Sequence, residues 1–224
     1  MYSSDSFFSL LRGLPLFQGL SNDSLSEIIE KTALAFSKVA SGQTFVQQDT
    51  PCTRLTYVIR GSLTAISSSH DHSFSIEEHE LHLPHVIEPE TLMGMRTLYT
   101  RSYRAGSDSV QLMTLDKPTI TDFMARYEVF RLNYLNQICH KAQQSYNRLW
   151  STPGTSIEDR FIDFLRRRML SPGGRKTIRI DMNRLSEELY CTRRSISAML
   201  HRLEDKGLMS MQRRKIEIPQ MENL

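Results

Sequence analysis

The spacing of hydrophobic residues changes along the chain, and the first change separates a short helix from a long stretch of strands. Within residues 21–35, Leu25, Ile28 and Ile29 recur at helical spacing behind a serine that suits a helix N-cap, which predicts a short amphipathic helix. Residues 36–116 contain short runs rich in Val, Ile, Thr, Phe and Tyr, interrupted by glycine and proline. Many short strands at regular intervals are typical of a small antiparallel barrel or roll.

The clearest strand in this segment covers residues 55–59, where apolar side chains alternate along the chain. Gly61 follows almost directly. We therefore expect a tight hairpin turn at this glycine and a second strand at residues 63–66.

A helical period returns after Pro118 and continues for roughly 25 residues, which predicts the longest helix of the chain. Residues 151–154, Ser-Thr-Pro-Gly, do not continue a helix, so we expect a hinge and a domain boundary there. A long amphipathic helix between two domains packs against its own β domain or against the same helix of a second subunit. We expect dimerisation, with packing inside one chain as the alternative. The expected dimer contacts are Phe130, Leu135, Ile138, Ala142 and Leu149.

The segment after this hinge has the spacing of a winged helix-turn-helix. A helix at residues 157–170 and a strand at residues 177–180 precede two short helices, which are separated by a break at residues 190–192. A helix of about seven residues cannot bury its apolar face alone, so the second helix must cross it and share one core. Residues 208–218 then predict a two-stranded wing with a basic tip. The apolar positions of the two helices are Leu185, Leu189, Cys191, Ile196, Met199, Leu200 and Leu203.

The other face of the second helix is the candidate DNA-binding surface. If the apolar positions face the core, an arginine pair near the helix start lies on the opposite face, where it reaches base edges in the major groove. Arginine donates two hydrogen bonds to guanine, whereas the alternative for such a pair is an ordinary solvated surface. The residues expected to contact bases are Arg193, Arg194 and Ser197. Those expected to contact phosphates are Thr192, His201, Arg202, Arg213, Arg214 and Lys215.

The charge distribution favours this interpretation. The whole chain has 28 Lys and Arg against 25 Asp and Glu, but residues 157–218 alone hold 15 basic and nine acidic side chains. A basic excess at one end of the chain favours contact with a polyanion through that end. The three cysteines lie far apart and form no recognisable disulfide or metal motif.

Other classes of protein lack support in the sequence. No apolar run is long enough to span a membrane and no secretory signal is visible, so we expect a cytoplasmic protein without membrane contact. The chain has no nucleophile elbow, P-loop, HExxH motif or dinucleotide fingerprint, so we do not expect an enzyme.

The order of these elements resembles the Crp/Fnr family of bacterial transcription regulators, named for the cyclic-AMP receptor protein and the fumarate and nitrate reduction regulator. The strongest match covers residues 185–218, where LSEEL, CTRRSIS, LEDKGL and the wing follow in family order. The segment GQTFVQQDTPCTRLTYVIRGSL is similar to the opening strands of the family's cyclic-nucleotide-binding roll.

The resemblance implies an α+β fold in three parts. Residues 1–117 would form a sensor-like, antiparallel β-roll of the jelly-roll type, residues 118–152 a long connecting and dimerisation helix, and residues 153–224 a winged helix-turn-helix DNA-binding domain. It also implies a homodimer on double-stranded DNA with an inverted-repeat operator, and RNA polymerase as a further candidate partner.

The segment that would bind a cyclic nucleotide departs from the family pattern. Family members that bind cyclic AMP carry a Gly-Glu pair and then an Arg followed by Ser or Thr and Ala. Here Gly94 is followed by Met95, and neither Arg101 nor Arg104 has that setting. We keep these four residues as the candidate effector pocket and expect no response to cyclic AMP. The oxygen-sensing branch holds an iron-sulfur cluster with cysteines mostly near the N-terminus, and since no cysteine precedes Cys52 we expect no such cluster.

A cluster of histidines leaves a second possibility open. Imidazole and carboxylate groups bind zinc, iron or haem, but the irregular spacing here favours a solvated hairpin. The effector is therefore unknown, and a metal- or haem-responsive sensor regulator is the main alternative function. A metal-dependent hydrolase, or an interaction module without DNA binding, would leave the basic C-terminal face unexplained. The histidines concerned are His70, His72, His79, His82 and His85.

Overall fold

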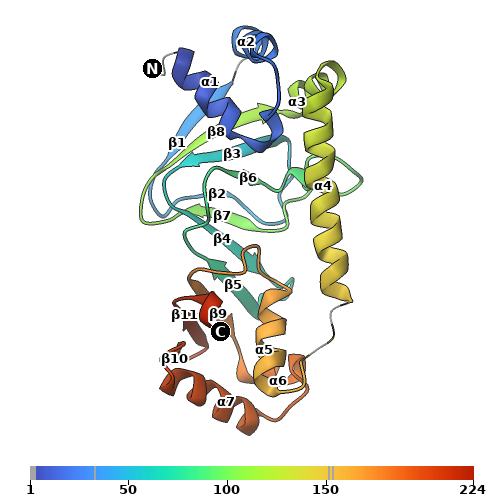
Figure 1. The fold of residues 1–224 in the computed structure, drawn as a ribbon. Coiled ribbons are helices and arrows are strands. Elements are labelled where there is room, and N and C mark those ends of the chain that lie inside the picture. Colours follow the sequence, from blue (N-terminus) through green and yellow to red (C-terminus); the bar gives the residue numbers. More distant parts are fainter. Residues whose placement is uncertain (1–3, 33, 151, 153) are drawn as a thin grey trace.

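The chain forms a β-roll with helices at one end, a long helix along its side and a smaller domain at the other end (Figure 1). The computed structural model describes residues 4–32, 34–150, 152 and 154–224. The roll and its helices comprise α1 (Ser4–Gly13), η1 (Pro15–Phe17), α2 (Asn22–Lys31), β1 (Ala35–Val39), β2 (Thr44–Val46), β3 (Arg54–Arg60), β4 (Leu63–Ser68), β5 (Phe74–Glu78), β6 (His85–Ile87), η2 (Pro89–Thr91), β7 (Ser102–Ala105) and β8 (Val110–Asp116). The remaining elements are α3 (Lys117–Arg126), α4 (Glu128–Leu149), α5 (Ile157–Arg166), β9 (Lys176–Ile180), α6 (Met182–Glu188), α7 (Arg193–Asp205), β10 (Ser210–Gln212), β11 (Lys215–Ile218) and η3 (Met221–Asn223).

The strands of the roll form two antiparallel sheets. One has the order β1-β8-β3-β6, and the other contains β5-β4-β7-β2. The hairpin expected at Gly61 is wrong, because β3 pairs with β8 and β6 while β4 pairs with β5 and β7. The chain instead crosses from one sheet to the other at this point. Gly61 has a φ of 106°, and a Cβ there would lie 2.2 Å from the Ser109 carbonyl oxygen, so only glycine fits.

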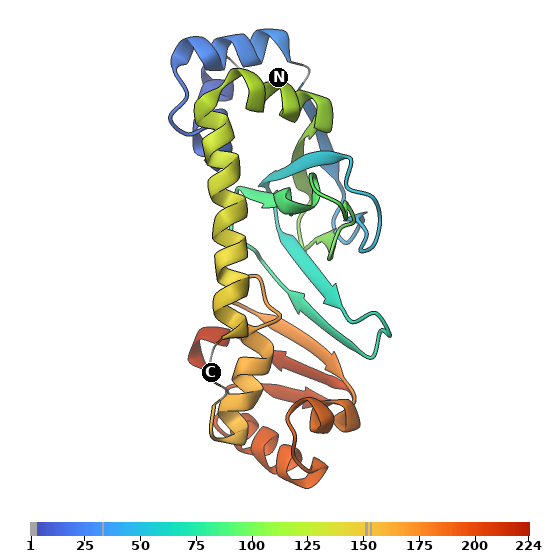
Figure 2. The same ribbon diagram turned by 90° about the vertical axis from the view of Figure 1, so that its right-hand side faces the viewer.

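Aromatic side chains join the helices to the roll. Phe17 lies 5.3 Å from Phe130 and 6.4 Å from Tyr57 and Phe123, measured between ring centroids. The single helix expected over residues 118–152 is divided at Tyr127, where the backbone is extended, into α3 and α4. Because of this break, Phe123 of α3 and Phe130 of α4 both pack against Phe17 in the core. α4 then runs along the roll towards the C-terminal domain (Figure 2).

The second sheet of the roll continues into the C-terminal domain. Its full order is β10-β11-β9-β5-β4-β7-β2, because β5 of the roll pairs with β9 in antiparallel register. Phe74 and Ile76 of β5 belong to the buried core formed mainly by α5, α6, α7 and β9. The sequence predicts separate domains joined by a hinge, whereas the structure also joins them by the pairing of β5 with β9.

The predicted α+β class is confirmed, with an antiparallel roll, a long helix and a winged helix-turn-helix in chain order. The helix expected at residues 157–170 ends earlier, at Arg166. Ser151 and Pro153 of the expected hinge lie outside the described residues. Within the described ranges, no helix has both the length and the hydropathy needed to cross a membrane.

Candidate nucleic-acid interface

Helices α6 and α7 form the predicted helix-turn-helix, and a capping side chain starts each of them. Asp181 accepts a hydrogen bond from the Asn183 amide at 2.8 Å, and Thr192 accepts one from the Ser195 amide at 3.2 Å. Tyr190 lies in the turn between the helices with a φ of 50°. These local features end α6 and start α7 in a new direction.

The inner face of this pair is buried, as predicted. Ile196, Met199, Leu200 and Leu203 are at most 1% exposed, and Leu185 of α6 is fully buried. Burial of one face fixes the rotation of α7 about its own axis. The opposite face must therefore point to solvent.

The outer face of α7 carries the residues expected to contact bases. Arg193 and Arg194 are exposed, and Ser197 is half-buried. Neither guanidinium forms an ion pair with the part of the chain that the structure describes. Both guanidinium groups therefore keep their hydrogen-bond donors available, as the expected bidentate hydrogen bonds to guanine require.

The residues expected to contact phosphates differ in whether groups of the same chain already contact their polar atoms. Arg202 is exposed, whereas His201 Nδ1 lies 3.5 Å from Glu204 Oε2. The Thr192 hydroxyl caps α7 and lies 2.9 Å from Ser195 Oγ, so its first role is structural.

The wing places three basic residues at and beside its tip. β10 pairs with β11, and Gln212 lies opposite Lys215, which leaves Arg213 and Arg214 in a two-residue turn. Arg214 Nε is 3.4 Å from Asp181 Oδ2, and Lys215 Nζ is 2.6 Å from Glu217 Oε1. Among the three, Arg213 is the one without an ion pair to any described residue, so it is the freest cation for a phosphate.

The exposed face of α4 differs partly from the expected dimer contacts. Phe130 is fully buried against Phe17 and Phe123 of its own chain, so its assignment to a dimer surface is wrong. Ile138 packs partly against the roll, Leu135 and Ala142 are exposed, and the side chain of Leu149 lies outside what the structure describes. The other exposed apolar residues of this helix and its C-cap, which are not among the expected dimer contacts, are Val129, Leu132, Tyr146 and Trp150.

The four residues kept as an effector pocket do not converge. Gly94 and Met95 lie in an exposed loop, and the Arg104 guanidinium is 2.9 Å from Glu77. Arg101 donates to Ser67 Oγ at 2.9 Å and lies 3.9 Å from Glu88.

Sequence reasoning missed Glu88, the buried carboxylate of this segment. Its oxygens accept hydrogen bonds from the Thr100 amide at 2.7 Å and from the Tyr103 hydroxyl at 3.3 Å. Burial raises the pKa of Glu88. The sequence feature that could have identified Glu88 is its position as an acidic residue inside the apolar run from Val86 to Pro89. The segment therefore contains a carboxylate and a guanidinium, but each is occupied by the chain's own groups.

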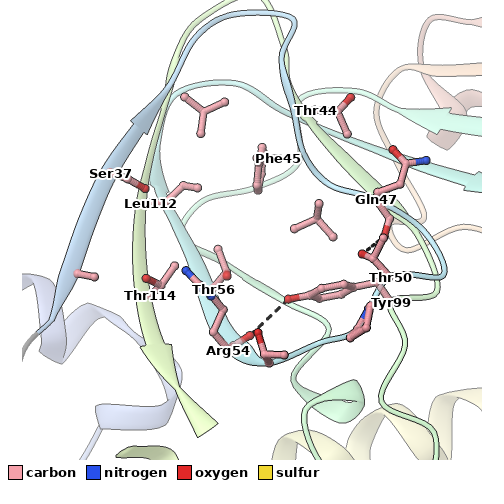
Figure 3. A pocket seen from close by; sticks show the side chains of 15 residues that line it. Ser37, Thr44, Phe45, Gln47, Thr50, Arg54, Thr56, Tyr99, Leu112 and Thr114 are labelled. Carbon is pink, nitrogen blue, oxygen red and sulfur yellow. Dashed lines mark hydrogen bonds between the residues drawn. The ribbon is translucent and has the colours of Figure 1, made fainter.

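The open end of the roll has a hollow of about 660 Å³ between the β1 and β2 edges. Figure 3 shows hydroxyl side chains around it, together with Phe45 and Leu112. Tyr99 donates to the Arg54 carbonyl at 3.4 Å at the rim. None of the four expected effector residues lines this hollow.

The five clustered histidines are spread over the structure. His70 and His72 lie at the exposed tip of the β4–β5 hairpin, and His82 is also exposed. His79 Nε2 is 2.9 Å from Thr177 Oγ1, and the His85 ring lies 6.3 Å from that of Tyr103. In the described ranges, no three His, Cys, Asp or Glu side chains are grouped to hold a metal ion.

Comparison with known proteins identifies the C-terminal part. The family model of the Crp-like helix-turn-helix domain matches residues 159–224. No curated protein matches the chain in sequence.

Several solved structures are similar to the chain. The catabolite activator protein of Thermus thermophilus is 16% identical, with 94% of this chain and 96% of that chain covered and a TM-score of 0.49. DNR from Pseudomonas aeruginosa is 18% identical, with coverages of 100% and 98% and a TM-score of 0.47. The c-di-GMP responsive global regulator CLP of Xanthomonas campestris is 14% identical, with coverages of 89% and 99% and a TM-score of 0.47.

The match to the family model falls on the segment that carries the buried helix pair and the basic wing. Residues 159–224 therefore form a Crp-like helix-turn-helix domain.

Proposed function

We propose that this protein is a sequence-specific DNA-binding regulator that acts as a homodimer on an inverted repeat and does not respond to cyclic AMP. The observation that carries the proposal is the outer face of α7. Arg193 and Arg194 are exposed there without ion pairs to the described residues, while the inner face of the same helix is fully buried. Such a helix can enter a major groove without rearrangement of its own domain. We place this activity in the cytoplasm, with RNA polymerase as a second candidate partner.

The exposed stripe of α4 supports the homodimer. Leu132 and Leu135 are 49% and 46% exposed, and Tyr146 and Trp150 are 61% and 74% exposed. Apolar side chains at this spacing on one long helix suit packing against the same helix of a second copy. Two recognition helices would then lie roughly 34–36 Å apart on one face of the duplex.

The occupied groups around Glu88 support the absence of a cyclic AMP response. A cyclic nucleotide needs a guanidinium for its phosphate and a carboxylate for its ribose hydroxyl. Arg101 already faces Ser67 and Glu88, and Glu88 already accepts from Thr100 and Tyr103. Binding would have to break these contacts before it could form its own. Titration calorimetry with cyclic AMP should therefore give no heat, and micromolar binding would contradict this part of the proposal.

Selection of bound sequences from random duplex DNA tests the DNA-binding function. Wild type should enrich an inverted repeat, and Arg193→Ala or Arg194→Ala should each relax the preference at one position per half-site, by about 1–3 kcal/mol. Arg213→Ala is the matched control, because loss of a phosphate contact weakens all sequences about equally. Identical enrichment by wild type and both helix variants would remove the two arginines from base recognition.

Sedimentation velocity tests the dimer. Leu135→Glu places a charge in the exposed stripe of α4 and should shift the protein to monomer, whereas Val129→Glu, near the start of the helix, should have a smaller effect. Both side chains are partly exposed, so neither change disrupts a fully buried site. A wild type that sediments as a monomer at micromolar concentration would refute the homodimer.

A further inference from the structure

The β4–β5 hairpin of the roll is built into the DNA-binding domain. Five consecutive residues of β5 pair with β9, from Phe74 opposite Ile180 to Glu78 opposite Lys176. The hairpin extends from the roll and joins the sheet that carries the wing, as both ribbon views show (Figures 1 and 2). The two domains therefore share backbone hydrogen bonds in addition to their covalent connection.

A buried ion pair fixes the register of this junction. Lys176 Nζ lies 2.9 Å from Glu78 Oε2, and the two side chains are 0% and 1% exposed. Glu78 also accepts hydrogen bonds from the Leu170 amide at 2.6 Å and the Ser171 amide at 3.0 Å. All three donors belong to the C-terminal domain. A shift of β5 along β9 would leave both buried charges without their partners, which is strongly unfavourable.

Further side chains of the hairpin contact both domains. Glu77 lies 2.9 Å from Arg104 of the roll and 3.3 Å from Arg179 of β9. The Phe74 ring is 5.1 Å from that of Phe164 in α5. The junction therefore combines an apolar contact, two ion pairs on one carboxylate and a strand ladder.

The other side of the DNA-binding domain is packed less tightly against the roll's long helix. A cavity of about 460 Å³ separates the end of α4 from the loop after α5, and Gln144, Asn147, Leu170 and Pro172 are among the residues that line it. The hairpin is therefore the main non-covalent attachment of the domain.

The junction leaves the DNA-facing surface open. α7 lies at the end of the molecule farthest from the roll (Figure 1), and Arg193 and Arg194 are exposed while β5 and β9 are paired. The hairpin therefore orients the domain without covering it. The strand ladder between β5 and β9 attaches the domain to the roll a second time, in addition to the covalent connection of the chain, and so holds it in one orientation.

We infer that the β4–β5 hairpin sets the half-site spacing that this regulator accepts, with Glu78 and Lys176 as positioning residues. The inference rests on the proposed dimer on an inverted repeat. When the hairpin holds each recognition helix rigidly relative to α4, only one separation of half-sites fits both helices at once. Release of the hairpin leaves the contacts within each half-site unchanged but removes the penalty for other separations.

Binding by the full-length protein to a spacing series tests this inference. Fluorescence anisotropy would be measured on a single half-site and on inverted repeats whose spacer is shortened or lengthened by one to four base pairs. Lys176→Met should leave half-site affinity within about twofold, lower the affinity for the optimal repeat about tenfold, and flatten the dependence on spacer length. Lys206→Met is the matched control, since its ammonium pairs with Glu158 inside the same domain at 3.7 Å.

A cross-link keeps the test decisive even if Lys176→Met fails to fold. Ser75 and Arg179 lie directly opposite each other on β5 and β9, so Ser75→Cys with Arg179→Cys can close a disulfide across the junction. The oxidised protein should bind the optimal repeat at least as tightly as the reduced protein. In the Lys176→Met background, oxidation should restore the spacing preference.

Three results would overturn the inference. One is a folded Lys176→Met protein with the wild-type spacing profile, and another is a cross-link that fails to restore that profile in this variant. The third is loss of binding to the optimal repeat on oxidation, which would show that the hairpin must open for DNA to bind. A wild type that binds repeats no better than half-sites would instead refute the proposed dimeric function, and the inference with it.

Discussion

Mild acid should destabilise this protein through His85 before most of its carboxylates protonate. Burial, with the nearby Lys141 ammonium as the second cause, lowers the pKa of His85 from 6.5 to about 4. Below pH 6.5 the unfolded chain binds a proton at this site that the folded chain does not bind. The free energy of unfolding therefore falls as the pH decreases from 6.5 towards 4. For these two values, the loss between pH 7 and pH 5 is about 2 kcal/mol.

Urea unfolding of wild type and His85→Gln at pH 7, 6 and 5 measures this loss. Glutamine does not titrate, so the variant should lose about 2 kcal/mol less than wild type between pH 7 and 5. Burial also lowers the pKa of His79 and raises that of Glu88, and these two effects have opposite signs on stability. Both groups remain in both proteins, so the difference isolates His85. Equal losses in the two proteins would refute the reasoning.

Substitutions of Leu200, Thr192 and Gly61 test the local geometry. Leu200→Ala removes a side chain that is 1% exposed and should lower the free energy of urea unfolding by about 2–5 kcal/mol. Thr192→Ala removes the cap of α7 and should cost about 1 kcal/mol in the same assay, whereas Thr192→Ser should cost less; equal losses would contradict the capping role. Gly61→Ala should lower the melting temperature more than Gly42→Ala, because both glycines have positive φ but only the first Cβ would clash with backbone, and equal shifts would refute the argument from space.

The C-terminal domain could be predicted well because its signals are local. The apolar positions of α6 and α7 follow a helical period, so the sequence alone indicated that Ile196 and Leu200 are buried and that Arg193 and Arg194 are exposed. The contact of these arginines with bases stays a prediction. Which basic residues of the wing are free could not be predicted, because the partner of Arg214 is Asp181, more than thirty residues away in the sequence.

The features that sequence reasoning missed depend on distant pairing. The run from β3 through Gly61 to β4 has the pattern of a hairpin, and only the partners β8 and β7 reveal that two sheets meet there. The residues of α4 gave a nearly continuous apolar stripe, but Phe130 faces the roll and Leu135 faces solvent. Helical spacing identifies a face, and it does not say which neighbour covers that face.

The pairing of β5 with β9 also determines which fragments of this protein can be studied in isolation. A fragment that starts after residue 154 would lose β5, and the edge of β9 would then expose a row of unpaired backbone N–H and C=O groups beside the uncompensated Lys176 ammonium. Bare sheet edges of this kind recruit strands from other molecules and promote aggregation. An excised C-terminal fragment would therefore self-associate, and quantitative tests of the proposed operator recognition call for the intact chain.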